Sequence, residues 1–162
     1  MQIKEAIILA GGLGTRLRSA VPELPKCMAP VAGKPFLAYI MHYLQKQGIE
    51  KFIFALGYKS EAFEDFIHSA LPAGNYELSV EAEPLGTGGA IKLACTKTIA
   101  DTVLATNGDT LFNTDVQKLS AFHLAHNAHC TLSLKPMKNF DRYGVVELNA
   151  DQSVKSFREK KF

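Results

Sequence analysis

The apolar run at residues 5–10, EAIILA, constrains the fold of this chain more than any other feature of its sequence. Its apolar residues are continuous, without polar alternation, and glycine follows them directly. Such a run is typical of a strand that is buried on both faces of a parallel sheet. The same run is much too short for a signal-peptide core or a membrane span, so neither is expected.

Patterns typical of strands and of helices alternate through the first two thirds of the sequence. Later strands are predicted at 51–57, 76–83 and 101–109, and helices at 36–47, 60–71, 88–98 and 115–126. This alternation predicts an α/β fold, with a Rossmann-like open, mostly parallel sheet and helices on both of its faces. The last third loses the alternation, with strand patterns at 129–136, 143–149 and 154–160, so an antiparallel element is predicted near the C-terminus.

Length, charge and cysteine content favour one cytoplasmic domain. The 162 residues predict a single domain, 1–162. A net charge of +2 is too small to favour nucleic acid or an anionic membrane as a partner, and neither is expected. The sequence has an odd number of cysteines, Cys27, Cys95 and Cys130, and no C-x-x-C pair. This pattern argues against a disulfide framework or a zinc site and fits a reducing compartment.

Four candidate binding segments, at 11–18, 57–59, 83–89 and 107–109, each follow a predicted strand. Ligands of open α/β sheets bind beyond the carboxyl ends of the strands. The four segments should therefore meet at one edge of the sheet.

The glycine-rich loop after the first strand has the residues of a phosphate site. Gly11, Gly12 and Gly14 allow close approach of the backbone, and their N–H groups can form an anion-binding concavity. Arg16 adds a planar guanidinium that matches phosphate oxygens. The loop is neither a G-x-G-x-x-G fingerprint nor a Walker A motif. Taken by itself, it is equally compatible with a simple turn.

Lys26 lies in a proline-rich stretch, LPKCMAPVAGKPF, at residues 24–36. Prolines restrict the backbone and can hold a lysine in place at little entropic cost. The alternative is an ordinary solvated surface lysine.

Several motifs together resemble the signature of the sugar-phosphate nucleotidyltransferases, also called nucleoside-diphosphate-sugar pyrophosphorylases. The first two are LAGGLGTRL, starting at Leu9, and PKCMAPVAGKP, starting at Pro25. The later ones are EPLGTGGA at 83–90, NGD at 107–109, RYGVVEL at 142–148 and SFREK at 156–160. The resemblance covers nearly the whole chain. Within the family, the combination is most similar to the bacterial heptose 1-phosphate guanylyltransferases of the D-glycero-α-D-manno type.

The resemblance implies an enzyme whose partners are a nucleoside triphosphate and a sugar 1-phosphate. The sugar phosphate attacks the α-phosphate in line and pyrophosphate leaves, a reaction that depends on cations and positioning. GTP and a manno-heptose 1-phosphate are the expected substrates, in nucleotide-sugar biosynthesis for cell-surface polysaccharide. A uridylyl- or cytidylyltransferase, or a non-catalytic nucleotide-binding or regulatory module, remains an alternative. A homo-oligomer is one option for the assembly.

The resemblance also implies roles for individual residues of the nucleotide site. The catalytic pair would be Arg16 and Lys26. The nucleotide would be bound by Leu9, Gly11, Gly12, Gly14, Thr15, Arg16, Glu83, Gly88 and Asn107. The Glu83 carboxylate can accept from guanine N1–H and N2–H₂ together, although a pyrimidine N3–H could also donate to it. The alternative for Glu83 is a surface acid.

The metal and sugar sites follow from the same resemblance. Asp109 matches the family's metal ligand, and a carboxylate at a strand end suits Mg²⁺. The alternative for Asp109 is a residue of a simple turn, and Asp115 nearby is interpreted as a helix cap. The sugar phosphate and sugar would be bound by Tyr143, Gly144, Glu159 and Lys160. Because the family carries a second metal-binding aspartate further along, we expect a C-terminally truncated family domain.

Overall fold

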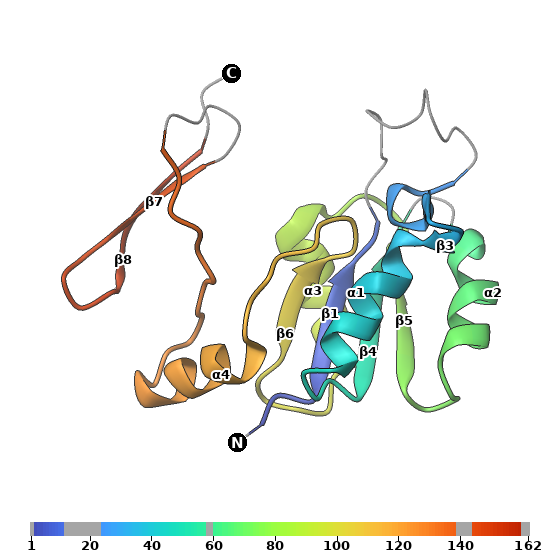
Figure 1. Cartoon of the computed structure of the whole chain (residues 1–162), viewed down its shortest axis with the longest axis horizontal. Helices are drawn as coiled ribbons and strands as arrows, with labels where there is room; N and C mark the ends of the chain where they lie inside the picture. The colour runs from blue at the N-terminus through green and yellow to red at the C-terminus, as the bar shows by residue number, and fades with distance from the viewer. Residues whose placement is uncertain (1, 12–23, 58–59, 139–143, 160–162) are drawn as a thin grey trace. The chain divides into compact units, whose positions relative to one another are not determined.

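The computed structural model describes residues 2–11, 24–57, 60–138 and 144–159 of the chain. They belong to two compact units, Met1–Thr131 and Leu132–Phe162 (Figure 1). The single domain over residues 1–162 stays a prediction.

The first unit is built on a four-stranded parallel sheet. Its strands are β1 (Glu5–Leu9), β4 (Lys51–Leu56), β5 (Tyr76–Val80) and β6 (Leu104–Asn107), in the order β5-β4-β1-β6. Ile7 of β1 lies in register with Ile53 on one side and Ala105 on the other. Strand β1 is thus an inner strand, and Ala6, Ile7 and Ile8 are fully buried, which explains its continuous apolar run.

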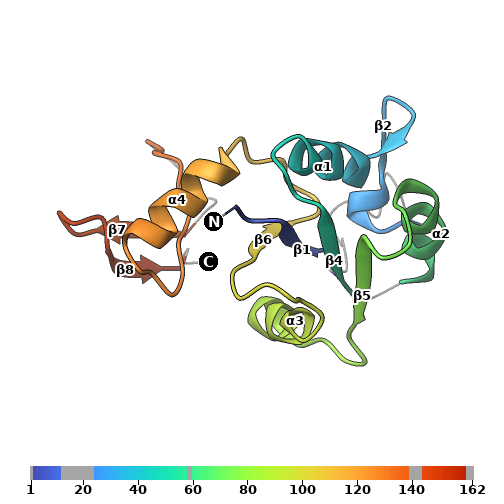
Figure 2. The same cartoon turned by 90° about the horizontal axis from the view of Figure 1, so that it is seen from below.

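Helices cover both faces of this sheet (Figure 2). Helices α1 (Phe36–Gln45) and α2 (Glu61–Ala70) lie on one face, and α3 (Gly86–Cys95) lies on the other. The first face holds the larger core, where Ile8 and Phe54 meet Leu37 of α1 and Phe63 of α2. The second face holds a smaller cluster formed by Ile7, Ile53 and Ala55 of the strands with Ala90 and Ala94 of α3. The predicted open parallel sheet with helices on both faces is confirmed.

Short elements connect the sheet to the rest of the first unit. A 3₁₀ turn, η1 (Lys26–Met28), leads into a small hairpin formed by β2 (Pro30–Val31) and β3 (Lys34–Pro35). Helix α4 (Val116–Ala125) begins directly after Asp115. The Asp115 Oδ1 atom accepts a hydrogen bond from the Lys118 backbone N–H at 2.9 Å, which confirms the predicted cap.

The predicted strand at 129–136 is wrong, because these residues belong to no strand of the structure. A period of two, as in Cys130, Leu132 and Leu134, makes a strand only where a neighbouring strand completes its backbone hydrogen bonds. The second unit contains the antiparallel hairpin of β7 (Val145–Leu148) and β8 (Val154–Arg158), which confirms the predicted antiparallel element. In the described part of the chain, no helix is both long enough and apolar enough to cross a membrane.

Candidate active site

A pocket of about 710 Å³ lies at the carboxyl ends of the four parallel strands. This volume is in the range of about 300–1,000 Å³ that is usual for small-molecule sites. Each strand contributes the residues at its end or just beyond it. The lining residues are Leu9, Ala10, Gly11, Lys26, Cys27, Ala55, Gly57, Glu81, Ala82, Glu83, Pro84, Gly86, Thr87, Ala90, Asn107 and Asp109. The predicted convergence of the strand ends on one edge is therefore observed.

Glycines allow these strand ends to approach each other closely. A Cβ atom on Gly11 would lie 3.1 Å from the backbone nitrogen of Gly57, and one on Gly57 would lie 3.2 Å from the Gly11 carbonyl oxygen. A Cβ atom on Gly108 would lie 3.2 Å from the Leu9 carbonyl oxygen, to which the Gly108 N–H donates at 2.8 Å. These glycines therefore permit backbone-to-backbone packing at the base of the pocket.

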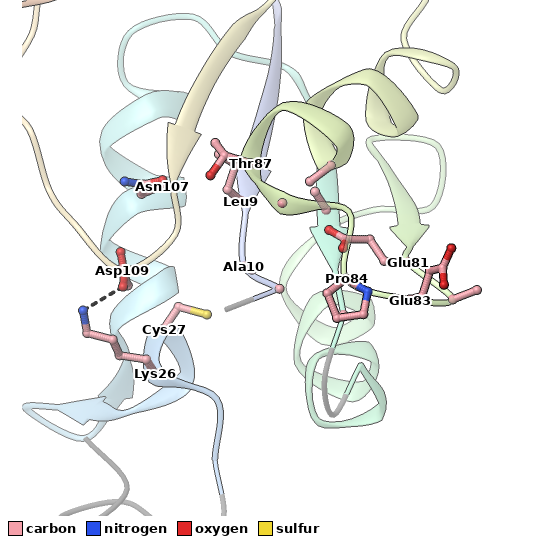
Figure 3. Close-up of a pocket in the computed structure, with 16 residues that line it drawn as sticks. Leu9, Ala10, Lys26, Cys27, Glu81, Glu83, Pro84, Thr87, Asn107 and Asp109 are labelled. Atoms are coloured by element: carbon pink, nitrogen blue, oxygen red, sulfur yellow. Dashed lines mark hydrogen bonds and ion pairs between the residues drawn. The ribbon is translucent and has the colours of Figure 1, made fainter. Parts of the chain in front are cut away.

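Lys26 enters the pocket from the η1 turn. Pro25 precedes the turn with φ −57°, and Cys27 and Met28 are buried beneath it. This anchoring leaves the Lys26 side chain about half exposed, and its Nζ atom lies 2.7 Å from Asp109 Oδ2 (Figure 3). The two residues are 83 positions apart in the sequence. The structure therefore brings the predicted catalytic lysine and the predicted metal ligand into direct contact.

Asp109 is held where the chain leaves β6. The Gly108–Leu9 hydrogen bond anchors the residue before it, and the Thr110 hydroxyl donates to Asp109 Oδ1 at 3.1 Å. Burial raises the pKa of the neighbouring Cys27 thiol to about 12, and the charge of Asp109 adds to that rise. Cys27 is thus a neutral, unreactive thiol at physiological pH.

The donor set at Asp109 fits a magnesium ion that arrives with a phosphate ligand. Among the residues that the structure describes, no cluster of three or more His, Cys, Asp or Glu side chains could hold a metal. Mg²⁺ is usually bound by one or two carboxylates together with substrate phosphates and water. One carboxylate at the mouth of a pocket meets this requirement only when phosphate oxygens complete the coordination.

Two carboxylates lie on the opposite side of the pocket from Lys26 (Figure 3). Glu81 is partly buried and accepts a hydrogen bond from the Leu85 N–H at its Oε2 atom, at 2.9 Å. Its Oε1 atom lies near Gly11, so the carboxylate points toward the middle of the pocket. Glu83 is exposed, and its carboxylate points outward. Sequence reasoning missed Glu81, because the predicted strand ran to residue 83, whereas β5 ends at Val80 and leaves Glu81 directly after the strand.

The structure gathers part of the predicted nucleotide site. Leu9, Gly11, Glu83 and Asn107 all line the pocket together with Lys26 and Asp109. Gly88 lies in the first turn of α3, outside the set of lining residues. Gly12, Gly14, Thr15 and Arg16 lie outside the described residues, so their predicted phosphate contacts stay predictions.

The predicted sugar site falls on the second unit. Gly144 directly precedes β7, and Glu159 directly follows β8 and is exposed. Tyr143 and Lys160 lie outside the described residues. The roles of these four residues stay predictions.

An open parallel α/β sheet with a pocket and charged side chains at the carboxyl ends of its strands has the architecture of a small-molecule-binding enzyme domain. The family model described as nucleotidyl transferase matches residues 5–160, and the chain belongs to this family.

Two relatives within the family are named as heptose 1-phosphate guanylyltransferases. The chain is 53% identical over 156 residues to the D-glycero-α-D-manno-heptose 1-phosphate guanylyltransferase of Aneurinibacillus thermoaerophilus, covering 96% of this chain and 67% of the relative. It is 44% identical over 158 residues to the enzyme of the same name from Campylobacter jejuni, covering 98% and 69%. The crystal structure of HddC from Yersinia pseudotuberculosis complexed with GMP-PN superposes with a TM-score of 0.76 at 35% identity, over 98% of this chain and 70% of that one.

Proposed function

We propose that this chain transfers a guanylyl group from GTP to a manno-heptose 1-phosphate, releasing pyrophosphate and forming a nucleotide sugar. The observation that carries the proposal is the contact between Lys26 and Asp109, 2.7 Å apart at the mouth of a pocket formed by four parallel strand ends. A cation next to a metal-binding carboxylate is what the meeting of two phosphate groups requires. The 53% identity to a heptose 1-phosphate guanylyltransferase supports the choice of substrates.

Lys26 is proposed to neutralise charge on the reacting phosphates. Its ammonium is paired with Asp109 and its side chain is about 43% exposed, so the charge is available at the pocket mouth. When phosphates enter, Lys26 turns from the carboxylate to the phosphate oxygens. The positive charge then offsets the negative charge that gathers around the α-phosphate during in-line attack. Arg16 is proposed to stabilise the leaving pyrophosphate in the same way.

Asp109 is proposed to hold Mg²⁺ together with the triphosphate. The bound ion would act as a Lewis acid and shield the phosphate charges from each other. In this chain, Asp109 would therefore have two successive roles. Asp109 neutralises Lys26 in the absence of nucleotide and becomes available to a divalent cation once Lys26 contacts phosphate.

The acidic loop after β5 is proposed to read the guanine base. Guanine presents N1–H and N2–H₂ on one edge, and a carboxylate can accept from both. The family resemblance of the stretch at 83–90 gives this role to Glu83. The inward direction and partial burial of Glu81 make it a second candidate for the same role. Either carboxylate would favour GTP over ATP, which lacks these two donors.

The rest of the proposal concerns the sugar and the setting of the enzyme. Tyr143, Gly144, Glu159 and Lys160 are proposed to contact the sugar phosphate. Cys27, Cys95 and Cys130 are all free thiols, as expected in a reducing compartment, and a cytoplasmic location is part of the proposal. A homo-oligomer remains an option for the assembly.

A pyrophosphate-release assay with four nucleoside triphosphates and a panel of sugar 1-phosphates tests the function. We expect turnover with GTP and a manno-heptose 1-phosphate. Turnover with UTP or CTP in preference to GTP would contradict the guanylyl assignment. Binding of GTP without turnover for any sugar 1-phosphate would support a non-catalytic nucleotide-binding module.

The Asp109→Asn variant tests the metal assignment in the same assay. The amide removes the negative charge that attracts Mg²⁺, while the side chain keeps its shape. We expect the Mg²⁺ concentration for half-maximal activity to rise, with little change in thermal stability. An unchanged Mg²⁺ titration would mean that Asp109 is only a residue of the turn after β6.

A further inference from the structure

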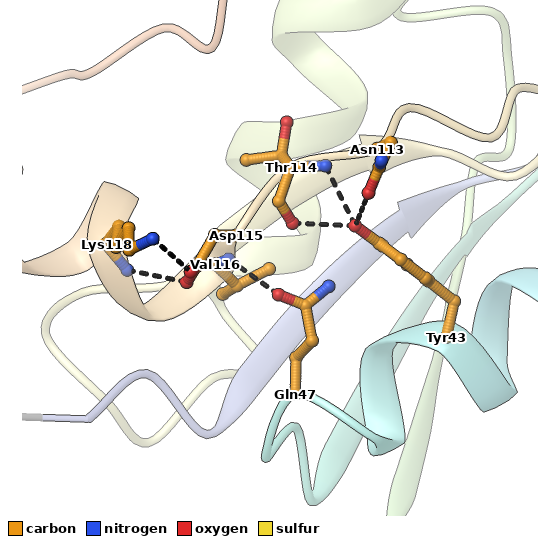
Figure 4. A network of polar contacts seen from close by, with 7 residues as sticks. All are labelled: Tyr43, Gln47, Asn113, Thr114, Asp115, Val116 and Lys118. Atoms are coloured by element: carbon orange, nitrogen blue, oxygen red, sulfur yellow. Dashed lines mark hydrogen bonds and ion pairs between the residues drawn. The ribbon is translucent and has the colours of Figure 1, made fainter.

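The Tyr43 hydroxyl on α1 holds the chain shortly after Asp109 (Figure 4). It donates to the Thr114 carbonyl oxygen at 2.7 Å and accepts from the Thr114 backbone N–H at 2.8 Å. The same hydroxyl lies 3.2 Å from Oδ1 of Asn113. One side chain therefore holds both backbone polar groups of Thr114, which fixes the position and the orientation of this residue.

This contact ends a segment of irregular backbone that carries Asp109. The segment, residues 108–115, is called the Asp109 segment below. At its start, the Gly108 N–H donates to the Leu9 carbonyl oxygen at 2.8 Å. Residues 110–115 form neither helix nor strand, so their path depends on such anchors.

A second anchor lies one residue beyond the segment. The Gln47 side-chain oxygen accepts from the Val116 N–H at 2.7 Å, and Val116 is itself only 2% exposed in the core. The start of α4 is thus held independently of Tyr43. Loss of the Tyr43 hydroxyl should therefore affect the Asp109 segment without unfolding the helix that follows it.

Helix α1 also holds the segment that carries Lys26. The backbone N–H of Phe36 donates to the Ala29 carbonyl oxygen at 3.0 Å, just after the η1 turn. The Tyr39 hydroxyl, one helical turn before Tyr43, donates to the Val31 carbonyl oxygen at 2.8 Å. One rigid helix is thus hydrogen-bonded to both of the segments whose charged residues meet at the pocket.

We propose that Tyr43 is a positioning residue that sets the location of Asp109 for metal and phosphate binding. Its hydroxyl holds Thr114 against α1, and the short path from Thr114 back to Gly108 confines the Asp109 carboxylate near Lys26. The metal-binding part of this inference rests on the function proposed above. Positioning of Asp109 in the nucleotide-free protein does not depend on that function.

The test compares Tyr43→Phe with Tyr39→Phe. Each variant removes from α1 one tyrosine hydroxyl that is hydrogen-bonded to the backbone of another segment. Only the Tyr43 hydroxyl contacts the Asp109 segment. In nucleotide-free protein, amide ¹H–¹⁵N spectra should show shifted signals for Asp109 and Thr110 in Tyr43→Phe and unshifted ones in Tyr39→Phe. Thermal unfolding should stay cooperative in both variants, because Gln47 and Val116 still anchor α4.

The metal is tested with Mn²⁺, whose binding to protein and GTP is measured by electron paramagnetic resonance. Tyr43→Phe should weaken Mn²⁺ binding about threefold to tenfold, the factor that corresponds to one ordinary hydrogen bond. In turnover, the Mg²⁺ half-saturation should rise similarly while the KM for the sugar 1-phosphate stays unchanged. Tyr39→Phe should match the wild type in each measurement, because the η1 turn that carries Lys26 is anchored by its own buried residues, Cys27 and Met28, independently of the Tyr39 hydroxyl.

The outcomes separate this inference from the proposed function. Unshifted Asp109 and Thr110 signals in Tyr43→Phe overturn the positioning role, whatever the enzyme does. Shifted signals with unchanged Mn²⁺ binding also overturn it, because Asp109 then moves without consequence for the metal. Absence of turnover by the wild type, together with shifted signals and weakened Mn²⁺ binding in Tyr43→Phe, would contradict the transferase assignment and support the positioning role.

Discussion

Lys26 and Asp109 carry the charges on which the proposed chemistry depends. They neutralise each other at 2.7 Å, although both are partly exposed. An exposed ion pair contributes little to stability, typically about 0–1 kcal/mol. We therefore interpret the pair as part of the site, and we expect changes at either residue to affect activity more than folding.

Lys26→Ala should lower turnover by ~10²–10³, the usual effect of removing one electrostatic contact to a transition state. The fold should survive, because Cys27 and Met28 anchor the η1 turn and Lys26 itself is partly exposed. Steady-state kinetics and circular dichroism measure the two effects. Lys34→Ala, which changes an exposed lysine in the next hairpin, is the control and should keep wild-type turnover. Near-normal turnover of Lys26→Ala would remove Lys26 from the catalytic machinery.

Base selection should depend on the acidic loop after β5. A glutamine in place of the reading carboxylate sets an amide N–H against a guanine N–H, and an unsatisfied buried polar group costs about 1–3 kcal/mol. GTP affinity should then fall about tenfold to a hundredfold, while ATP affinity changes little. We expect this loss in Glu81→Gln, because the Glu81 carboxylate points into the pocket.

Calorimetric titration of GTP and ATP into both glutamine variants separates the candidate residues. A selective loss of GTP affinity in Glu83→Gln alone would assign base reading to Glu83, as the sequence predicts. Equal losses for GTP and ATP would show that these carboxylates shape the loop without reading the base.

At the scale of elements, the ends of helices and strands build the site. The η1 turn presents Lys26, the end of β6 presents Asp109, and α1 is hydrogen-bonded to the segments that follow both. The start of α4 is independently capped by Asp115. Because the cap is a carboxylate, its contribution to stability should depend on pH.

The Asp115 side chain should stabilise the first unit only at pH values at which its carboxyl group is ionised. The hydrogen bond from the Lys118 N–H holds the pKa of Asp115 below its ordinary value of 3.8. Because the folded pKa lies below the unfolded one, the stabilisation is fully present above the unfolded pKa and disappears as pH falls through the folded pKa. Thermal unfolding of Asp115→Ala should therefore show a lower Tm than wild type at pH 6, and the difference should shrink below pH 3.8.

Asp115→Asn is the matched control for this pH dependence. Asparagine caps helices about as well as aspartate but does not titrate in this range. Its Tm should exceed that of Asp115→Ala at every pH at which the proteins unfold cooperatively. A Tm difference between Asp115→Ala and wild type that persists undiminished well below pH 3.8 would contradict a role for the charge.

At the scale of the whole molecule, the first unit has an asymmetric core. The face under α1 and α2 holds the large side chains, among them Phe52, Phe54 and Phe63, which are fully buried. The face under α3 is closed mainly by small residues, including Ala55, Ala90 and Ala94. Ala55 and Ala90 also line the pocket, so small side chains there leave room for a ligand.

Phe54→Ala should lower the free energy of unfolding by about 3–5 kcal/mol, because it leaves a cavity in the larger core. Phe54 is 0% exposed and stacks on Phe52 with ring centroids 6.0 Å apart. Urea denaturation of the whole chain, followed by circular dichroism, measures the change, and Phe54→Leu should lose less. A loss below about 1 kcal/mol for Phe54→Ala would show that this core can collapse around the missing ring.

The parts of the fold that follow from local patterns could be predicted from the sequence. A continuous apolar run predicted β1 as a strand buried on both faces, and alternation of patterns predicted the parallel sheet. The position of Asp115 at the start of a predicted helix predicted the cap of α4. These features depend on backbone preferences and on the period with which buried residues recur, and both are set by residues that lie close together in the sequence.

The contacts between distant segments were decided by the tertiary structure alone. The strand order β5-β4-β1-β6 brings Asp109 to Lys26 across 83 positions of sequence and turns Glu81 toward Gly11. The hydrogen bonds of Tyr43 arise in the same way, and residues 129–136 stay irregular although their pattern is that of a strand. Sequence periodicity records which residues are buried, whereas pairing depends on which segments the folded sheet places side by side.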